Sequence, residues 1–205
     1  MAKQTKLTFR ERLIIQLNDR FCGKSANVTF GKDLNGDLIS NGSQPAINCF
    51  DNPPVEVMAT QWFDDYWFYI NIRVLHESKE KLQLFASASF FQNVGSTLKQ
   101  LFRAEWDSYK AQEDYSHPQP HWHFTAQLSD VTSFSELENM EEEGEYNKLL
   151  GNSKSINLDK MHFSMAGDWF NTGDMVTKIV DENTLVDWLI HLFAHVREEL
   201  SYKES

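Results

Sequence analysis

The sequence predicts an α+β protein with a single antiparallel meander sheet of about five to seven strands, on which an N-terminal helix and a C-terminal amphipathic helix pack. Three observations support this class. Apolar residues recur at helical spacing near both ends of the chain, in residues 1–24 and 183–202. Between them, residues 55–166 contain successive segments rich in aromatic and β-branched residues. No internal repeat or low-complexity linker divides the chain, so we expect residues 1–205 to form one domain.

The N-terminal helix is predicted from a start signal and a stop signal. Thr8 and Glu11 have the spacing of a capping box, and Gly23 is typical of a helix end. Between these signals the apolar residues recur at helical intervals, namely at Leu13, Ile14, Leu17 and Phe21. We therefore expect a helix with one apolar face in this segment.

The middle of the chain is predicted to be a series of strands. Asn35-Gly36 indicates a hairpin turn, whereas residues 40–54 are expected to form a loop because they contain Asn41-Gly42 and Pro53-Pro54. The predicted strands that follow are Val55–Thr60, Tyr66–Leu75, Leu82–Phe91, Leu101–Tyr109, His121–Leu128 and Met161–Met165. Short turns between consecutive strands favour antiparallel pairing.

Alternation within one of these strands predicts a sheet with two different faces. In Leu82–Phe91, Ser87 and Ser89 alternate with Ala86 and Ala88. Successive side chains of a strand point to opposite faces, so one face of the sheet should be small and polar and the other apolar.

Two further elements complete the prediction. Residues 135–150, with Glu141-Glu-Glu-Gly-Glu145 at their centre, are expected to form an acidic surface helix inserted into the sheet region. Asn183 is predicted to cap the C-terminal helix. The apolar residues of that helix form one stripe, Leu185, Trp188, Leu189, Leu192, Phe193, Val196 and Leu200, so it should lie across the sheet.

The charge is acidic overall and uneven along the chain. The net charge of −11 disfavours broad, sequence-independent binding to nucleic acid, which depends on neutralising many phosphates. Residues 1–24, however, carry six lysines or arginines and only two acidic residues, a local charge of +4. This basic segment either guides a protein partner or polyanion to one edge, or is a solvated helix face.

Several protein classes are not favoured by the sequence. No apolar run approaches twenty residues and no signal peptide is recognised, so we expect a cytoplasmic protein without a membrane partner. Cys22 and Cys49 lack the spacing of a zinc ribbon or a disulfide scaffold.

A histidine-rich stretch, residues 115–125, is the strongest candidate for a functional site. It contains His117, His121 and His123. The last two are two residues apart, so on a strand they project from the same face, while Trp122 points to the other.

The strands expected beside this stretch carry polar residues at matching positions. Arg103, Glu105 and Asp107 share one face of their strand, and His162 shares a face with Ser164 on another. If these strands are neighbours, the histidines and the carboxylates converge on one pocket.

Such a cluster supports more than one chemistry. His121, His123 and His162, with a carboxylate, would bind a divalent ion such as zinc, iron or manganese and activate a water molecule. Alternatively, His123-Phe-Thr125 and His162-Phe-Ser164 resemble the motifs of two-histidine phosphoesterases, in which paired histidines act as acid and base. His-x-His followed by a distant histidine also resembles the cupin metal motif. A structural alternative is that the histidines pack at a turn ordered by Pro118 and Pro120.

A wider set of motifs resembles one bacterial family. Arg103-Ala-Glu-Trp-Asp107 precedes His117-Pro118-Gln-Pro-His121-Trp-His123, and Met161-His162 then precedes an amphipathic helix from Thr184. This order is similar to that of the TumE-like group of small bacterial proteins. The resemblance implies a cytosolic component of a toxin-antitoxin or phage-defence system that acts on RNA or nucleotides.

Two functions therefore follow as expectations. In the first, the protein is a histidine-dependent phosphodiesterase or nuclease. Its catalytic residues would be His121, His123, His162, Glu105 and Asp107, and its substrate-binding residues would be Arg103, His117, Thr125 and Ser164. In the second, it is a non-enzymatic acidic module that binds a cognate toxin, antitoxin or defence subunit, with the aromatic run Trp62–Phe68 as a contact surface.

Overall fold

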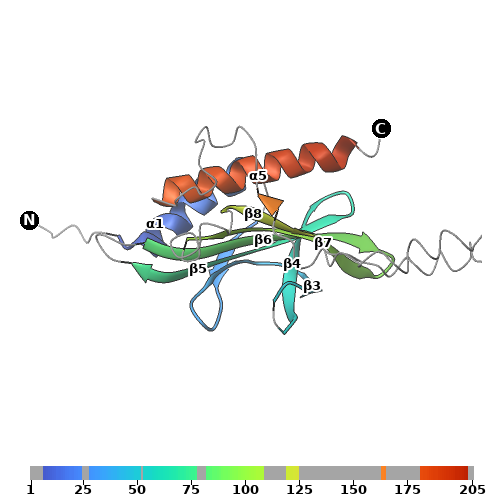
Figure 1. Ribbon diagram of the computed structural model, residues 1–205, viewed down its shortest axis with the longest axis horizontal. Helices are drawn as coiled ribbons and strands as arrows, with labels where there is room; N and C mark the ends of the chain where they lie inside the picture. Colours follow the sequence, from blue (N-terminus) through green and yellow to red (C-terminus); the bar gives the residue numbers. More distant parts are fainter. Residues whose placement is uncertain are drawn as a thin grey trace, which may run out of the picture.

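An antiparallel sheet forms the centre of the computed structural model, and both helices lie on one of its faces (Figure 1). The strands β3 and β4 extend from the other face. The structure describes residues 7–24, 28–51, 53–77, 82–108, 119–124 and 181–202, together with the backbone of 163–164. The predicted class, an α+β fold with a largely antiparallel sheet and two flanking helices, is confirmed.

The first helix begins where the sequence predicts it. α1 (Phe9–Gln16) starts with the capping box, in which Thr8 and Glu11 satisfy each other's backbone N–H groups. It continues into the π-helical turn η1 (Leu17–Cys22), which ends at Gly23. The predicted apolar positions face the sheet, and Leu13, Leu17 and Phe21 are fully buried.

The described strands pair in the order β1-β2-β5-β6-β7-β8-β9, while β3 pairs with β4 and β4 also pairs with β5. Their bounds are β1 Phe30–Lys32, β2 Leu38–Ser40, β3 Gln44–Asn48, β4 Val55–Phe63, β5 Tyr66–Glu77, β6 Leu82–Val94, β7 Thr97–Asp107, β8 His121–Phe124 and β9 Phe163–Ser164. All of the pairs are antiparallel, and β5 to β9 form the predicted meander.

The predictions for residues 28–54 are partly right. The turn at Asn35-Gly36 joins β1 to β2, and Gly36 adopts φ of 83°, a left-handed conformation that favours glycine. The prediction of a loop over residues 40–54 is wrong, because Gln44–Asn48 forms β3 against β4. The turn-forming pairs Asn41-Gly42 and Pro53-Pro54 lie outside this strand, and Pro45 within it is tolerated because proline is compatible with an edge strand.

The larger hydrophobic core lies between the sheet and the helices. Its members come from α1, α5 and the inward faces of β5, β6 and β7. Phe193 of α5 is at its centre, because its ring contacts those of Phe21, Trp62, Phe68 and Phe90. The aromatic run Trp62–Phe68 thus contributes mainly to packing rather than to an exposed surface.

The second helix, α5 (Glu182–Tyr202), carries the predicted apolar stripe, and every member of that stripe is buried. Its cap is Asp181 and not Asn183, since the Asp181 carboxylate accepts hydrogen bonds from the backbone and the hydroxyl of Thr184 at 2.8 Å. Aspartate and asparagine both favour the N-cap position of a helix, so the sequence does not show which of the two residues is the cap.

Two basic side chains of the N-terminal segment form ion pairs with the C-terminal helix. Arg12 forms an ion pair with Glu182 at 2.7 Å, and Arg20 forms another with Asp187. These contacts join the two helices. Among the described residues, no helix combines the length and the apolar character needed to cross a membrane.

Candidate metal centre

The register between β7 and β8 brings the predicted polar residues together. Arg103 lies directly opposite His123, and Glu105 lies opposite His121. The residues between them, Ala104 and Trp122, point to the helix face. The predicted pairing of these strands is confirmed, and it places both imidazoles beside the β7 side chains.

The polar face extends further across the sheet than the histidine motif indicates. One row of directly opposed residues comprises Asn71, Ser87, Glu105 and His121. The next row comprises Tyr69, Ser89, Arg103 and His123. The alternation in β6 predicted the two serines, whereas nothing in the sequence of β5 distinguished Tyr69 and Asn71 from ordinary strand residues.

Glu105, His121 and His123 form a compact group that could hold a metal ion. One ligand atom from each lies within 4.8 Å of the others. The two Nε2 atoms are 2.8 Å apart, and Nε2 of His123 is 3.3 Å from Oε2 of Glu105. All three residues are buried, with exposed fractions of 3%, 0% and 7%. Groups of this kind are costly to bury unless they bind one another or a cation.

The two imidazole nitrogens and the Glu105 carboxylate could coordinate a small divalent ion if the side chains moved slightly. Two imidazole nitrogens bound to a tetrahedral zinc ion lie about 3.3 Å apart, given bonds of about 2.0–2.1 Å. The His123–Glu105 distance of 3.3 Å already matches this edge. The two imidazoles need to separate by only about 0.5 Å, and the Nε2 of His121 must approach the carboxylate.

Glu105 is held in its ionised form. Burial alone raises the pKa of its carboxyl, but the hydrogen bond from His123 and the positive charge of Arg103 outweigh that effect. The net result is a pKa lowered to about 2. A carboxylate is therefore ready to accept a cation throughout the neutral range.

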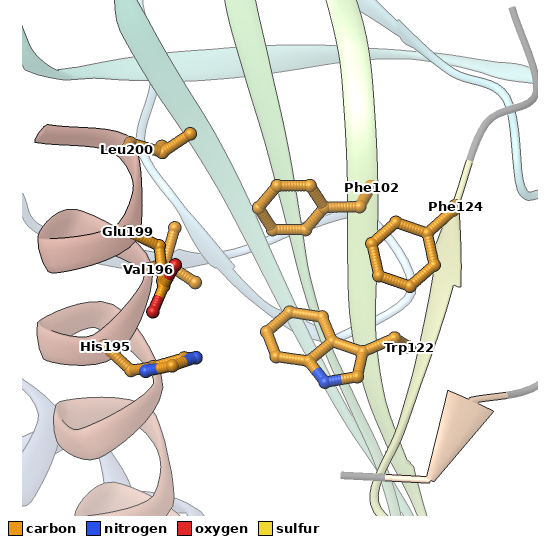
Figure 2. A pocket seen from close by; sticks show the side chains of 7 residues that line it. All are labelled: Phe102, Trp122, Phe124, His195, Val196, Glu199 and Leu200. Atoms are coloured by element: carbon orange, nitrogen blue, oxygen red, sulfur yellow. The ribbon is translucent and has the colours of Figure 1, made fainter. Parts of the chain in front are cut away.

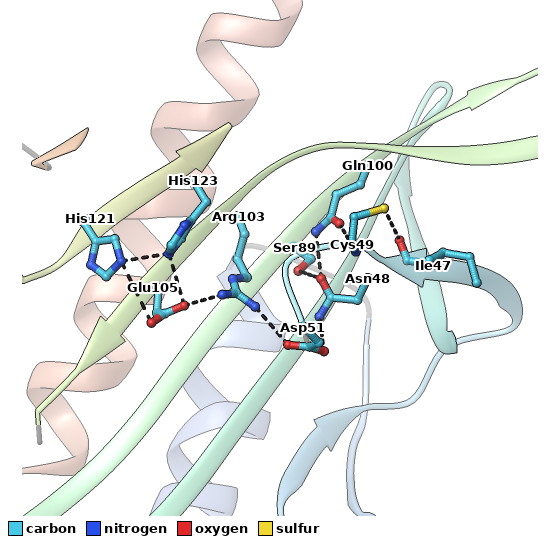
Figure 3. A network of polar contacts seen from close by, with 10 residues as sticks. All are labelled: Ile47, Asn48, Cys49, Asp51, Ser89, Gln100, Arg103, Glu105, His121 and His123. Carbon is cyan, nitrogen blue, oxygen red and sulfur yellow. Dashed lines mark hydrogen bonds and ion pairs between the residues drawn. The ribbon is translucent and has the colours of Figure 1, made fainter. Parts of the chain in front are cut away.

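A segment that was predicted only as a loop covers this group. Figure 3 shows Arg103 between Glu105 and Asp51. Its Nη2 is 2.6 Å from Oε2 of Glu105, and its Nη1 is 3.0 Å from Oδ1 of Asp51. The ring of Phe50 lies 5.3 Å from that of His123 and also 5.3 Å from the Arg103 guanidinium. Phe50 and Asp51 were not predicted, because no local pattern relates them to a strand about fifty residues away.

Of the remaining predicted residues, some lie in the part of the chain that the structure describes and the others lie outside it. Asp107 is buried on the same strand as Glu105, but its carboxylate is outside the metal-binding group found among the described residues. The backbone of Ser164 lies opposite His121, so the predicted neighbouring strand is confirmed. His117, Thr125, His162 and the acidic segment 135–150 lie outside the residues that the structure describes.

A groove lies on the other face of β8. Figure 2 shows Phe102, Trp122 and Phe124 on one side, and His195, Val196, Glu199 and Leu200 of α5 on the other. Its volume is about 360 Å³. Because Trp122 points away from its neighbours His121 and His123, this groove and the metal-binding group are separated by the strand itself.

No protein-family model, curated protein or solved structure matches this chain.

Proposed function

We propose that Glu105, His121 and His123 bind a divalent metal ion, zinc or manganese, and that this centre hydrolyses phosphodiester bonds in RNA or nucleotides. The observation that carries the proposal is the meeting of three buried ligand atoms within 4.8 Å of one another. Two imidazoles and one carboxylate are a common ligand set for catalytic divalent metals. When bound, the ion would polarise the phosphate and lower the pKa of a water molecule.

The charge balance favours a metal ion over the metal-free mechanism with two histidines. With neutral imidazoles, the described group contains two carboxylates, Asp51 and Glu105, and one guanidinium, Arg103. Its net charge is then negative, so a cation is attracted and a phosphate is repelled. Binding of a divalent ion reverses the sign of the charge and makes the same group attractive to an anionic substrate.

The biological setting rests on the sequence alone. The His-Pro-x-x-His-x-His motif supports a role in a bacterial toxin-antitoxin or phage-defence system, within the cytoplasm. The alternative, a non-enzymatic module that binds a toxin, antitoxin or defence subunit, stays a prediction. It is less well supported by the aromatic run at residues 62–68 now that much of this run packs in the core.

Metal content and hydrolysis provide the test. Protein without a histidine tag is incubated with zinc or manganese, desalted and analysed by elemental mass spectrometry. We expect about one ion per chain in the wild type and little in His121→Asn or His123→Asn, because each loses one of three ligands. His191→Gln is the matched control, since it removes an exposed imidazole of α5 outside the group.

The loaded proteins are then assayed on bis(p-nitrophenyl) phosphate and on single-stranded RNA. The wild type and His191→Gln should hydrolyse at least one substrate, and His123→Asn should be at least about a hundredfold slower with a similar melting temperature. Wild-type protein that binds no ion would refute the metal centre. Protein that binds an ion but cleaves neither substrate would refute the hydrolase and leave metal binding in place.

A further inference from the structure

The guanidinium of Arg103 forms ion pairs with two carboxylates, and these contacts limit its ability to bind a substrate. Arg103 is only 6% exposed, and separate nitrogens contact Glu105 and Asp51, at 2.6 and 3.0 Å. Arginine presents its donors in a rigid fork, so both contacts determine where the side chain lies. A substrate phosphate would have to displace one of these carboxylates to reach the same nitrogens.

Asp51 is itself held by a network that leads back to the sheet. The side-chain amide of Asn48 donates to Asp51 Oδ2 at 2.8 Å. The side-chain oxygen of Asn48, Oδ1, accepts hydrogen bonds from the Ser89 hydroxyl of β6 and the Gln100 side-chain amide of β7, at 3.1 and 2.9 Å. Gln100 also accepts a hydrogen bond from the backbone of Cys49. The segment 48–51 is thereby anchored over β6 and β7, and β7 also carries Glu105 of the metal-binding group (Figure 3).

Phe50 also contacts Arg103. Its ring packs against the guanidinium and against His123, at 5.3 Å in each case. A cation over an aromatic face is stabilised, so this contact further restricts the position of the guanidinium. The contacts from Asp51 to Glu105 therefore run through a buried, geometrically restricted arginine.

We propose that Arg103 and Asp51 are positioning residues of the metal centre: Asp51 orients Arg103, and Arg103 orients the Glu105 carboxylate towards the two imidazoles. This inference rests on the proposed metal site and assigns Arg103 a role other than the substrate contact expected from the sequence. Outer residues that hold a metal ligand in place typically contribute about 10- to 100-fold in metal affinity.

The inference is tested by zinc affinity at pH 7, measured by competition with a chromogenic chelator on the full chain. Asp51→Asn and Arg103→Met should each weaken zinc binding by about tenfold or more. For Arg103→Met this is the opposite of the charge effect alone, because loss of the guanidinium makes the group more negative. Arg73→Met is the matched control. It removes another arginine–carboxylate pair, with Asp37 at 2.7 Å, from strand β5, which β6 separates from β7, and it should bind zinc like the wild type.

A double variant separates positioning from general loss of structure. If Asp51 acts through Arg103, then adding Asp51→Asn to Arg103→Met should weaken zinc binding no further. The side chain of Asp51 is 39% exposed, so Asp51→Asn is informative even if loss of the buried Arg103 lowers the melting temperature.

The outcomes distinguish this inference from the proposed function. Wild-type protein that binds neither zinc nor manganese would overturn both. Wild-type protein that binds zinc, with unchanged affinity in Asp51→Asn and Arg103→Met, would overturn only the positioning role. Additive losses in the double variant would overturn the order of action from Asp51 through Arg103.

Discussion

Glu105 is the residue on which most contacts of the candidate centre depend. It contacts Arg103, His121 and His123, and it is 3% exposed. An isolated carboxylate at such a position would become protonated, because burial penalises the charged form. The cations and donors around it reverse that tendency, so its ionised state is a property of the cluster rather than of the residue.

This ionisation predicts how the stability of the metal-free protein depends on pH. The pKa of Glu105 is about 2 in the folded protein, below the ordinary value of 4.5. A lowered pKa contributes stability above about pH 4.5, and this contribution is lost as the pH falls towards 2, with a full size on the order of 3 kcal/mol. Urea unfolding between pH 6 and pH 3 should show this loss.

Two variants identify the source of that dependence. Glu105→Gln cannot titrate, so its free energy of unfolding should fall less steeply over the same interval. Glu56→Gln, which removes an exposed carboxyl of β4, should follow the wild type. Equal slopes in Glu105→Gln and the wild type would show that the carboxylate is not stabilised as the structure indicates.

The helix α5 depends on tertiary packing for its stability. A 21-residue amphipathic helix presents one apolar stripe, and its stability comes from the burial of that stripe on the sheet. Phe193 is 1% exposed and its ring contacts rings from η1, β4, β5 and β6. It links the helix layer to the sheet.

Phe193→Ala should therefore lower the free energy of unfolding by about 3–5 kcal/mol, because it leaves a cavity among aromatic rings that cannot easily collapse. Phe124→Ala is the matched control, since it deletes the same atoms from a ring that is 38% exposed, and its effect should be clearly smaller. Urea unfolding monitored by circular dichroism measures both. Similar losses in the two variants would contradict the central position of Phe193.

Features of the helices and strands were predicted correctly where they depend on residues close together in the sequence. The capping box at Thr8 and Glu11, the turn at Asn35-Gly36 and the stripe of α5 each depend on residues a few positions apart. The strand β3 was missed because its pairing with β4 is not visible in the local sequence, and a segment containing Pro45 has little strand character of its own.

At the scale of the whole molecule, the sheet separates two environments. Its helix face buries the large hydrophobic core, and its other face carries the metal-binding group and a smaller cluster of Ala46, Val57, Ala59, Tyr69 and Phe91. Distant sites without shared contacts usually contribute additively to stability. The core and the candidate centre should therefore respond separately to substitution.

Metal binding should stabilise the folded protein as a whole. An ion that binds only the folded state adds about 2.7 kcal/mol at a free concentration one hundred times its Kd. We expect thermal unfolding to show this increase in the wild type and an equal increase in Phe193→Ala, whose defect lies on the other face. His121→Asn should show none. An equal increase in His121→Asn would place the ion elsewhere.

Local sequence patterns are enough to predict the two helices, most of the strands and the common face of His121 and His123, because helix signals and strand alternation depend on neighbouring residues. The other features follow from contacts between distant segments of the chain. The register of β7 against β8 sets Glu105 opposite His121, and the β3–β4 pair brings Asp51 over Arg103. Such long-range partners depend on how the whole chain packs, and no short stretch of residues encodes them.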